Sequence, residues 1–170
     1  MNYKVIIPAR LGSTRLPGKP LKEINGKTLI QRVVDQVKKS SADSIYVATD
    51  SKDIIDHCDQ YQISTLLTSK EHQTGSDRLA EACNLLNLED ETLIVNVQGD
   101  EPFIDPRDID NLAKLASNKV SNMTTLFSSL KDKELNDESV VKLWLNTEGR
   151  VEEFSRSVGS RNSINAKKHI

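Results

Sequence analysis

Short aliphatic runs alternate with longer segments of helical periodicity over the first 120 residues. The aliphatic runs predict strands at residues 4–8, 44–48, 63–68 and 93–97. Apolar residues spaced by three or four predict helices near residues 29–37, 52–61, 79–86 and 109–116. Asp105, followed by Pro106, is the predicted N-cap of the last of these helices. Strands that alternate with helices form a mostly parallel sheet, because right-handed crossovers place helices on its faces. The sequence therefore predicts an α/β fold with three αβα layers around a Rossmann-like sheet.

The pattern changes after residue 120. Residues 123–130, 140–145 and 151–154 predict strands with no long helix between them. The last two flank the turn sequence Asn-Thr-Glu-Gly at 146–149, which predicts an antiparallel hairpin over about 138–156. Because 170 residues suit one ordinary domain, we expect a single domain over 1–170. The final residues close no element, and we expect the domain to be truncated there.

Composition indicates a soluble globular protein. The chain is 36% hydrophobic and 28% charged, without an apolar run long enough for a membrane span. Its first residues do not resemble a signal peptide, so we expect the cytoplasm. Cys58 and Cys83 fall within predicted helices, which suits reduced, packing thiols. A near balance of 23 basic and 25 acidic residues argues against a general nucleic-acid or membrane surface.

Positive charge is concentrated at the amino-terminal end. Residues 1–40 contain 9 lysines and arginines but 2 acidic residues, and the first 20 residues contain no acid. This asymmetry indicates a local anion site, with a plain basic surface patch as the alternative.

The loop after the first predicted strand contains many of these cations. Its two glycines, two hydroxyls and three cations are Gly12, Gly18, Ser13, Thr14, Arg10, Arg15 and Lys19. Ligands of an open parallel sheet bind at the carboxyl ends of its strands. Glycines let backbone amides approach an anion, and the cations can form charge-assisted hydrogen bonds. We therefore predict a site for a di- or triphosphate, against the alternative of a solvated basic loop.

The loop after the fourth predicted strand, residues 96–102, places Asp100 just beyond a buried strand. Mg²⁺ prefers carboxylate oxygens and usually takes one or two of them together with phosphate oxygens. Asp100 is therefore a candidate magnesium ligand. An Asx turn leading into the next helix is the alternative.

A third polar run, residues 72–78, enters the third predicted helix. Its amides and hydroxyls could contact a base, and Arg78 could add a fourth cation. The alternative is a helix start in which Thr74 is the N-cap and Asp77 lies in the first turn.

Several motifs stand in order along the chain: residues 9–21 (ARLGSTRLPGKPL), 24–27 (INGK), 47–50 (VATD), 72–81 (HQTGSDRLAE), 95–102 (VNVQGDEP) and 154–156 (FSR). Together they closely resemble the 3-deoxy-manno-octulosonate cytidylyltransferases, the CMP-Kdo synthetases. The resemblance covers essentially the whole chain and implies a sheet of the nucleotide-diphospho-sugar transferase type.

The resemblance implies a Mg²⁺-dependent transfer of CMP from CTP to the anomeric hydroxyl of Kdo, with release of pyrophosphate, as a step toward lipopolysaccharide. It implies that Arg15, Lys19 and Asp100 are catalytic: the two cations neutralise charge on the phosphates, and Asp100 is the metal ligand. The implied nucleotide-binding residues are Arg10, Ser13, Thr14, Arg15, Lys19, Ser76 and Arg78. The implied sugar-binding residues are Gln98, Arg156 and His169.

This chain departs from the family in two ways. We expect it to lack the family's carboxyl-terminal third, which would carry a second metal carboxylate, more of the sugar pocket and much of a homodimer contact. The segment after Arg156 also lacks the Ile-Pro pair usual in the family. Two alternatives therefore stand beside Kdo activation. One is a non-catalytic CTP-binding remnant, and the other is a nucleotidyltransferase for another acidic sugar such as an amino-Kdo.

Overall fold

The structure is a computed structural model that describes residues 2–12, 16–118, 123–159 and 165–170. The chain divides into two compact units, Met1–Asn122 and Met123–Ile170. Their boundary coincides with the change of sequence pattern after residue 120. The expectation of one nucleotidyltransferase domain over the whole chain stays a prediction.

The first unit is built on a four-stranded parallel sheet in the order β5-β4-β1-β6. Its strands are β1 (Lys4–Ala9), β4 (Ser44–Thr49), β5 (Thr65–Leu67) and β6 (Ile94–Asn96). In the centre, Val5 pairs with Ile45 on one side and with Val95 on the other. All four strands were predicted from their aliphatic runs.

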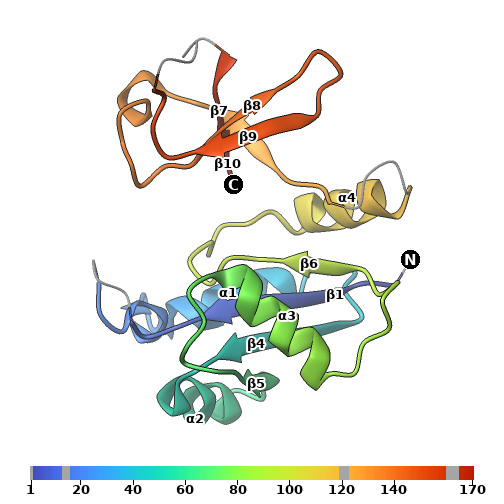
Figure 1. Ribbon diagram of the computed structural model, residues 1–170. Helices are drawn as coiled ribbons and strands as arrows, with labels where there is room; N and C mark the ends of the chain where they lie inside the picture. The colour runs from blue at the N-terminus through green and yellow to red at the C-terminus, as the bar shows by residue number, and fades with distance from the viewer. Residues whose placement is uncertain (1, 13–15, 119–122, 160–164) are drawn as a thin grey trace. The chain divides into compact units, whose positions relative to one another are not determined.

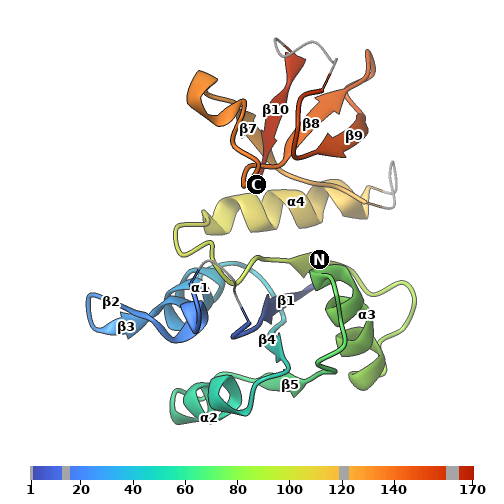
Figure 2. The same ribbon diagram turned by 60° about the vertical axis from the view of Figure 1, so that its left-hand side comes forward.

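Helices cover both faces of this sheet, as Figures 1 and 2 show. They are α1 (Leu29–Val37), α2 (Lys52–Gln60), α3 (Gly75–Leu85) and α4 (Pro106–Ser117). Val5 and Ile7 of β1 pack in one core with residues of α1, α2 and α4, whereas Ile6 packs with Ala82 of α3. Alternate residues of β1 therefore serve opposite faces, which confirms the expected three layers.

Polar caps start these helices where the sequence predicts them. The Thr74 hydroxyl accepts the Asp77 N–H at 3.1 Å, and the Asp77 carboxylate accepts the Thr74 N–H in return. Asp105 caps α4 ahead of Pro106. Such caps satisfy amide groups that lack a partner within the helix. Both predicted N-caps are confirmed.

A small hairpin before α1 was not predicted from the sequence. Strands β2 (Glu23–Ile24) and β3 (Lys27–Thr28) pair in antiparallel fashion after a short 3-10 helix, η1 (Lys19–Leu21). Asn25 and Gly26 both have positive φ, which is the conformation of a tight hairpin turn. The Arg32 guanidinium donates to the carbonyl oxygens of Ile24 and Asn25 and supports the turn. Strands of two residues are too short to produce a periodic pattern.

The second unit contains an antiparallel sheet in the order β7-β10-β8-β9. Its elements are β7 (Phe127–Ser129), η2 (Asp132–Glu134), β8 (Lys142–Leu145), β9 (Val151–Ser155) and β10 (Lys167–His169). Strands β8 and β9 confirm the predicted hairpin. The sheet is larger than expected, because β10 lies between β7 and β8.

Both cysteines are free, as predicted: Cys58 lies on α2 and Cys83 on α3. Burial raises the pKa of the Cys58 thiol to about 11, so it is protonated near neutral pH. Within the described ranges, no helix is both long and apolar enough to cross a membrane.

Gly99 lies where the loop after β6 passes the end of β1. A Cβ atom at this position would lie 2.8 Å from the carbonyl oxygen of Pro8 and 3.6 Å from Ala9 Cβ. The first distance is too short for a carbon atom beside a backbone oxygen. Glycine therefore allows this loop to approach β1, and it fixes the position of the neighbouring Asp100.

We expect Gly99→Ala to lower the free energy of unfolding by about 1–3 kcal/mol, because the added methyl group has no room beside the backbone. Gly12→Ala is the matched control, since no atom of the described residues lies within 4 Å of a Cβ at Gly12. We expect the control to change stability by about 0.5 kcal/mol or less. Urea denaturation measures both, and equal effects would contradict the close approach.

Candidate functional site

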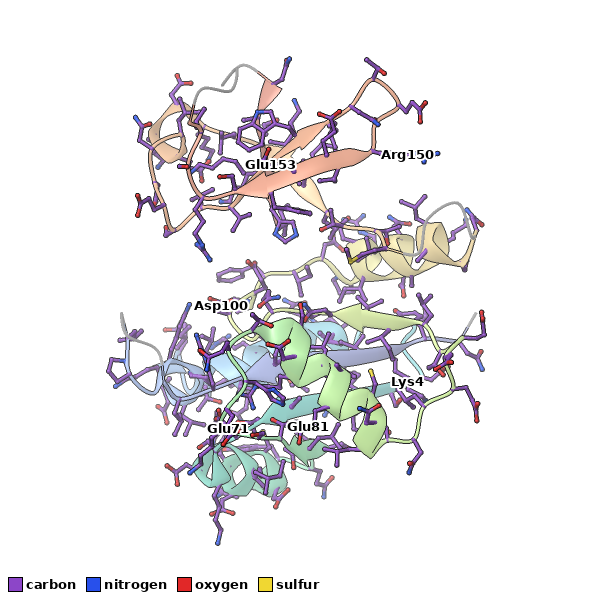
Figure 3. All side chains as sticks on the ribbon, in the orientation of Figure 1. Lys4, Glu71, Glu81, Asp100, Arg150 and Glu153 are labelled. Carbon is purple, nitrogen blue, oxygen red and sulfur yellow. The ribbon has the colours of Figure 1, made fainter. Side chains whose placement is uncertain are left out.

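The polar loops of the first unit gather at one edge of its sheet. Strands β1, β4, β5 and β6 are parallel, so their carboxyl ends lie together. The loops that leave this edge include all three polar runs singled out in the sequence. Figure 3 shows Asp100 at this edge and Lys4 at the opposite end of β1.

Lys19 and Asp100 meet directly, although 81 residues separate them in the sequence. The Lys19 ammonium donates to Asp100 Oδ2 at 2.5 Å, and the two side chains are 37% and 49% exposed. An ion pair with this much exposure contributes only about 0–1 kcal/mol to stability. The sequence predicted that these two residues would share one edge, and the structure brings them into contact.

Two backbone hydrogen bonds shape the basic loop, the segment from the end of β1 to the start of η1 that carries the predicted phosphate-binding cations. The Gly18 N–H donates to the Leu11 carbonyl at 3.2 Å, and the Lys19 N–H donates to the Leu16 carbonyl at 3.2 Å. Gly18 has a φ of 69°, which favours glycine. This local fold delivers the Lys19 side chain to the edge of the sheet.

Other predicted phosphate contacts are described only in part. Arg10 directly follows β1 and is exposed. Ser13, Thr14 and Arg15 lie outside the described residues. Their roles stay predictions.

Arg78 is buried, with 3% of its side chain exposed. Its Nη2 donates to Asp50 Oδ2 at 2.7 Å, and its Nη1 donates to the Thr68 hydroxyl and to the Ser69 carbonyl oxygen. Asp50 follows β4, and Thr68 and Ser69 follow β5. The guanidinium therefore ties α3 to the ends of two strands. Its predicted contact with a nucleotide is not tested by this arrangement, but its charge already has a protein partner.

Ser76 lies in the first turn of α3 and is exposed. A Cβ at the preceding Gly75 would lie 3.7 Å from Pro8 Cγ, so α3 begins close to the end of β1. The Ser76 hydroxyl is therefore at the same edge as Asp100.

A second contact network, absent from the sequence interpretation, holds the segment before α3. His72 Nε2 lies 2.5 Å from Glu81 Oε2, which also accepts the Ser69 N–H at 2.8 Å. The Ser69 N–H, and then the His72 side chain, lower the pKa of Glu81. The stability that Glu81 contributes is therefore present above its ordinary pKa and is lost as pH falls through the lowered value.

Gln98 is exposed beyond β6, and its carbonyl oxygen accepts the Glu101 N–H at 3.2 Å. It lies two residues before Asp100 on the same loop, as the sequence shows. Its predicted role toward a sugar is untested.

The two remaining sugar candidates, Arg156 and His169, belong to the second unit. Arg156 Nη1 donates to the carbonyl oxygens of Glu138 and Ser139 at 2.9 and 3.4 Å. His169 Nε2 lies 2.8 Å from Thr125 Oγ1, and burial lowers the pKa of His169. Both side chains are thus anchored within their own sheet region.

Lys142 is fully buried beside Arg156. Its ammonium donates to the carbonyl oxygens of Asp137 at 2.6 Å and of Arg156 at 2.8 Å. Buried cations need such bonds to replace water. Lys142 and Arg156 therefore both bind the 137–139 loop, one through its ammonium and the other through its guanidinium. The sequence gives no signal for this, because a lysine at the start of a strand is usually exposed.

Asp100 is the candidate for metal binding. The described residues contain no group of three or more His, Cys, Asp and Glu side chains that could hold a metal ion. A divalent cation at this edge would need oxygen ligands from a bound molecule as well, and a polyphosphate supplies them.

The opposite edge of the sheet has the wrong charge for a polyphosphate. A cavity of about 380 Å³ opens there, lined by Asn2, Tyr3, Lys4, Asp43, Glu89, Glu91, Thr92 and Leu93. Three carboxylates face one amine in this lining. The distribution of charge therefore favours the carboxyl-terminal edge, around Lys19 and Asp100, as the binding site of a polyphosphate.

The sheet and the helices on its two faces define an α/β protein with a Rossmann-like parallel sheet. The structure of a 4-diphosphocytidyl-2C-methyl-D-erythritol synthase superposes with a TM-score of 0.63 over 99% of this chain and 71% of that chain. At 13% identity, the likeness is one of fold alone.

The chain belongs to the cytidylyltransferase family, whose model matches residues 4–168. The 3-deoxy-manno-octulosonate cytidylyltransferase of Polynucleobacter necessarius is 48% identical over 158 residues, which are 92% of this chain and 62% of that protein. The enzyme of that name from Herminiimonas arsenicoxydans is 43% identical over 157 residues, covering 92% and 63%. The chain thus spans less than two thirds of the length of these relatives.

A solved structure supports the same relationship. The CMP:2-keto-3-deoxy-manno-octonic acid synthetase complexed with CTP is 32% identical, with a TM-score of 0.83. The similarity covers 99% of this chain and 71% of that chain. The family resemblance inferred from the sequence motifs is therefore confirmed.

We expect Arg78→Met to lower the free energy of unfolding by about 3 kcal/mol, because it leaves a shielded carboxylate without its cation. Lys27→Met is the matched control: it breaks the pair between Lys27 and Asp35, whose side chains are 54% and 42% exposed. The control should cost about 1 kcal/mol or less. Urea denaturation compares the two, and similar losses would rule out a bracing role for Arg78.

Proposed function

We propose that this chain binds CTP at the carboxyl-terminal edge of its parallel sheet and transfers CMP to Kdo, with release of pyrophosphate. The observation that carries the proposal is the meeting of Lys19 and Asp100 at 2.5 Å on that edge. The names of the relatives supply the substrates: a 3-deoxy-manno-octulosonate cytidylyltransferase at 48% identity and a related synthetase complexed with CTP.

The basic loop would bind the triphosphate. We assign its oxygens to Arg10, Arg15 and Lys19, with help from the hydroxyls of Ser13 and Thr14. Charge-assisted hydrogen bonds of this kind contribute about 1.5–3 kcal/mol each. Ser76, exposed at the start of α3, would contact the nucleotide from the other side of β1. Arg78 would act indirectly, because its hydrogen bonds to Asp50, Thr68 and Ser69 hold the start of α3 in position.

Asp100 suits a Mg²⁺ ion that arrives with the nucleotide. Its carboxylate is half exposed, and the ion usually takes one or two carboxylates together with phosphate oxygens. When bound, Mg²⁺ would neutralise charge on the phosphates. Asp100 would hold its oxygen ligand in place through the fixed loop at Gly99.

The reaction would need little covalent chemistry from the protein. The anomeric oxygen of the sugar forms a bond to the α-phosphorus, the bond to the bridging oxygen breaks, and pyrophosphate leaves with that electron pair. The sugar hydroxyl loses its proton to solvent water. Correct alignment of two reactants can supply up to about 7–11 kcal/mol of the barrier reduction. Lys19 and Arg15 would stabilise the charge that develops on the phosphates.

The acceptor would be an acidic sugar. In the second unit its candidate ligands are Arg156 and His169, and in the first unit Gln98 is a separate candidate. An arginine fork can bind a carboxylate through two parallel hydrogen bonds. Arg156 is held through Nη1 by two backbone carbonyls, which fixes the plane of its guanidinium. Kdo fits this chemistry, and so does another sugar acid such as an amino-Kdo.

A second candidate function follows from the candidate metal site. Binding of CTP without turnover is the rival proposal, because Asp100 is a single candidate metal ligand and the described residues hold no group of three or more potential metal-binding side chains. Both proposals require the same nucleotide site.

We expect Lys19→Ala to weaken CTP binding about tenfold or more in isothermal titration calorimetry. A charge-assisted bond of about 1.5–3 kcal/mol is lost, and 1.4 kcal/mol corresponds to tenfold. Lys22→Ala is the matched control, because Lys22 is exposed three residues away. An affinity unchanged by Lys19→Ala would refute the phosphate assignment.

Turnover separates the two candidate functions. We expect pyrophosphate release when the chain is incubated with CTP, Mg²⁺ and Kdo, and loss of its Mg²⁺ dependence in Asp100→Asn. CTP binding without pyrophosphate release from Kdo or amino-Kdo would instead favour the binding function. Undiminished Mg²⁺ dependence in Asp100→Asn would move the metal ligand elsewhere.

A further inference from the structure

We infer that Lys19 blocks metal binding at Asp100 until a nucleotide arrives, so that metal and nucleotide bind this chain together and not metal first. The inference rests on the proposed function, because it assigns phosphates as the groups that draw Lys19 away. It concerns how this chain's own two side chains exchange partners.

In the ion pair, the Lys19 ammonium occupies the position at Asp100 that a metal ion would take. Lys19 Nζ lies 2.5 Å from Asp100 Oδ2, which is hydrogen-bonding distance to the oxygen that a metal would use. Two positive centres that share one carboxylate repel each other strongly at such separations. A metal ion must therefore displace the ammonium or bind without that oxygen.

Asp100 offers a free metal ion little compensation for this displacement. No group of three or more potential metal-binding side chains occurs in the part of the chain that the structure describes. A free ion would gain one carboxylate from this edge and would keep most of its water. Mg²⁺ gives up its water reluctantly, so a lone and already paired carboxylate is a poor site.

The two partners differ in how firmly they are held. Asp100 follows Gly99, whose backbone passes so close to Pro8 that a Cβ would lie 2.8 Å from its carbonyl oxygen. Lys19 stands at the start of a three-residue 3-10 helix and reaches Asp100 through a flexible four-carbon stem. Both side chains are more than a third exposed. Lys19 is therefore the partner that moves, and Asp100 is the one that stays.

Phosphate groups of the nucleotide would replace Asp100 as the partner of the Lys19 ammonium. A triphosphate carries several negative charges, whereas Asp100 carries one, so a bound nucleotide competes effectively for the ammonium. Its release leaves the Asp100 carboxylate beside phosphate oxygens, which together make an acceptable set of ligands for a divalent ion. Coupling of this kind is reciprocal: nucleotide raises metal affinity by the same factor as metal raises nucleotide affinity.

Mn²⁺ binding without nucleotide tests the block directly, measured by electron paramagnetic resonance at low ionic strength. Wild type should bind Mn²⁺ weakly, and Lys19→Met should bind it about threefold to fivefold more tightly, the change that about 1 kcal/mol produces. Lys22→Met removes an equal charge three residues away and should change affinity by less than about twofold. Lys19→Met combined with Asp100→Asn should lose the gain. Equal Mn²⁺ affinity in wild type and Lys19→Met would overturn the inference.

The reverse arm uses CTP in the presence of a chelator. Asp100→Asn releases Lys19, so metal-free CTP should bind this variant at least threefold more tightly than wild type in calorimetry. Weaker binding by Asp100→Asn would overturn the exchange. Both variants alter exposed groups, and thermal melting verifies that they are folded.

The two arms also separate this inference from the proposed function. If CTP fails to bind wild type with or without metal, the proposed function fails, whatever the Mn²⁺ result. If CTP binds and depends on Lys19, while Lys19→Met leaves Mn²⁺ affinity unchanged, the function stands and the block by Lys19 is refuted.

Discussion

Burial of β1 on both faces is the constraint on which the first unit depends. Val5 and Ile7 face one core and Ile6 faces the other, and all three are fully buried. Because β1 pairs with β4 and β6, its carboxyl end lies between the ends of its neighbours. The loop that carries Lys19 leaves from this point, and the loop that carries Asp100 leaves from β6. A packed apolar strand thus sets the position of two exposed charged groups.

The cations of this chain divide into two kinds. Arg78 and Lys142 are buried, and each donates to backbone carbonyl oxygens of loop residues: Arg78 to Ser69, and Lys142 to Asp137 and Arg156. They stabilise loops. Lys19 is exposed, and its one recorded side-chain contact in the described ranges is an ion pair with Asp100. Only a solvent-exposed cation such as Lys19 can exchange one anionic partner for another with a small change in free energy. Position in the fold, and not residue type, decides which role an arginine or lysine has.

Local periodicity was sufficient to predict the four parallel strands, the helices between them and the caps at Thr74 and Asp105. It was also sufficient to predict that Lys19 and Asp100 share an edge, because strand order and direction determine where loops emerge. It did not reveal the bonds of Arg78 with Asp50 or of Lys142 with Arg156. These contacts join residues far apart in sequence. The pairing of β10 with β7 and β8 was not predicted, because these partner strands lie in distant segments of the sequence.

The burial of Lys142 has a consequence for chemical labelling. An acylating reagent needs a solvent-exposed, neutral amine, and this ammonium is enclosed between two carbonyl oxygens. Lysines on the surface would be modified first, while Lys142 would react only when its sheet opens. Its rate of modification, followed by mass spectrometry, is therefore a built-in measure of how often residues 123–170 come apart in the otherwise native protein.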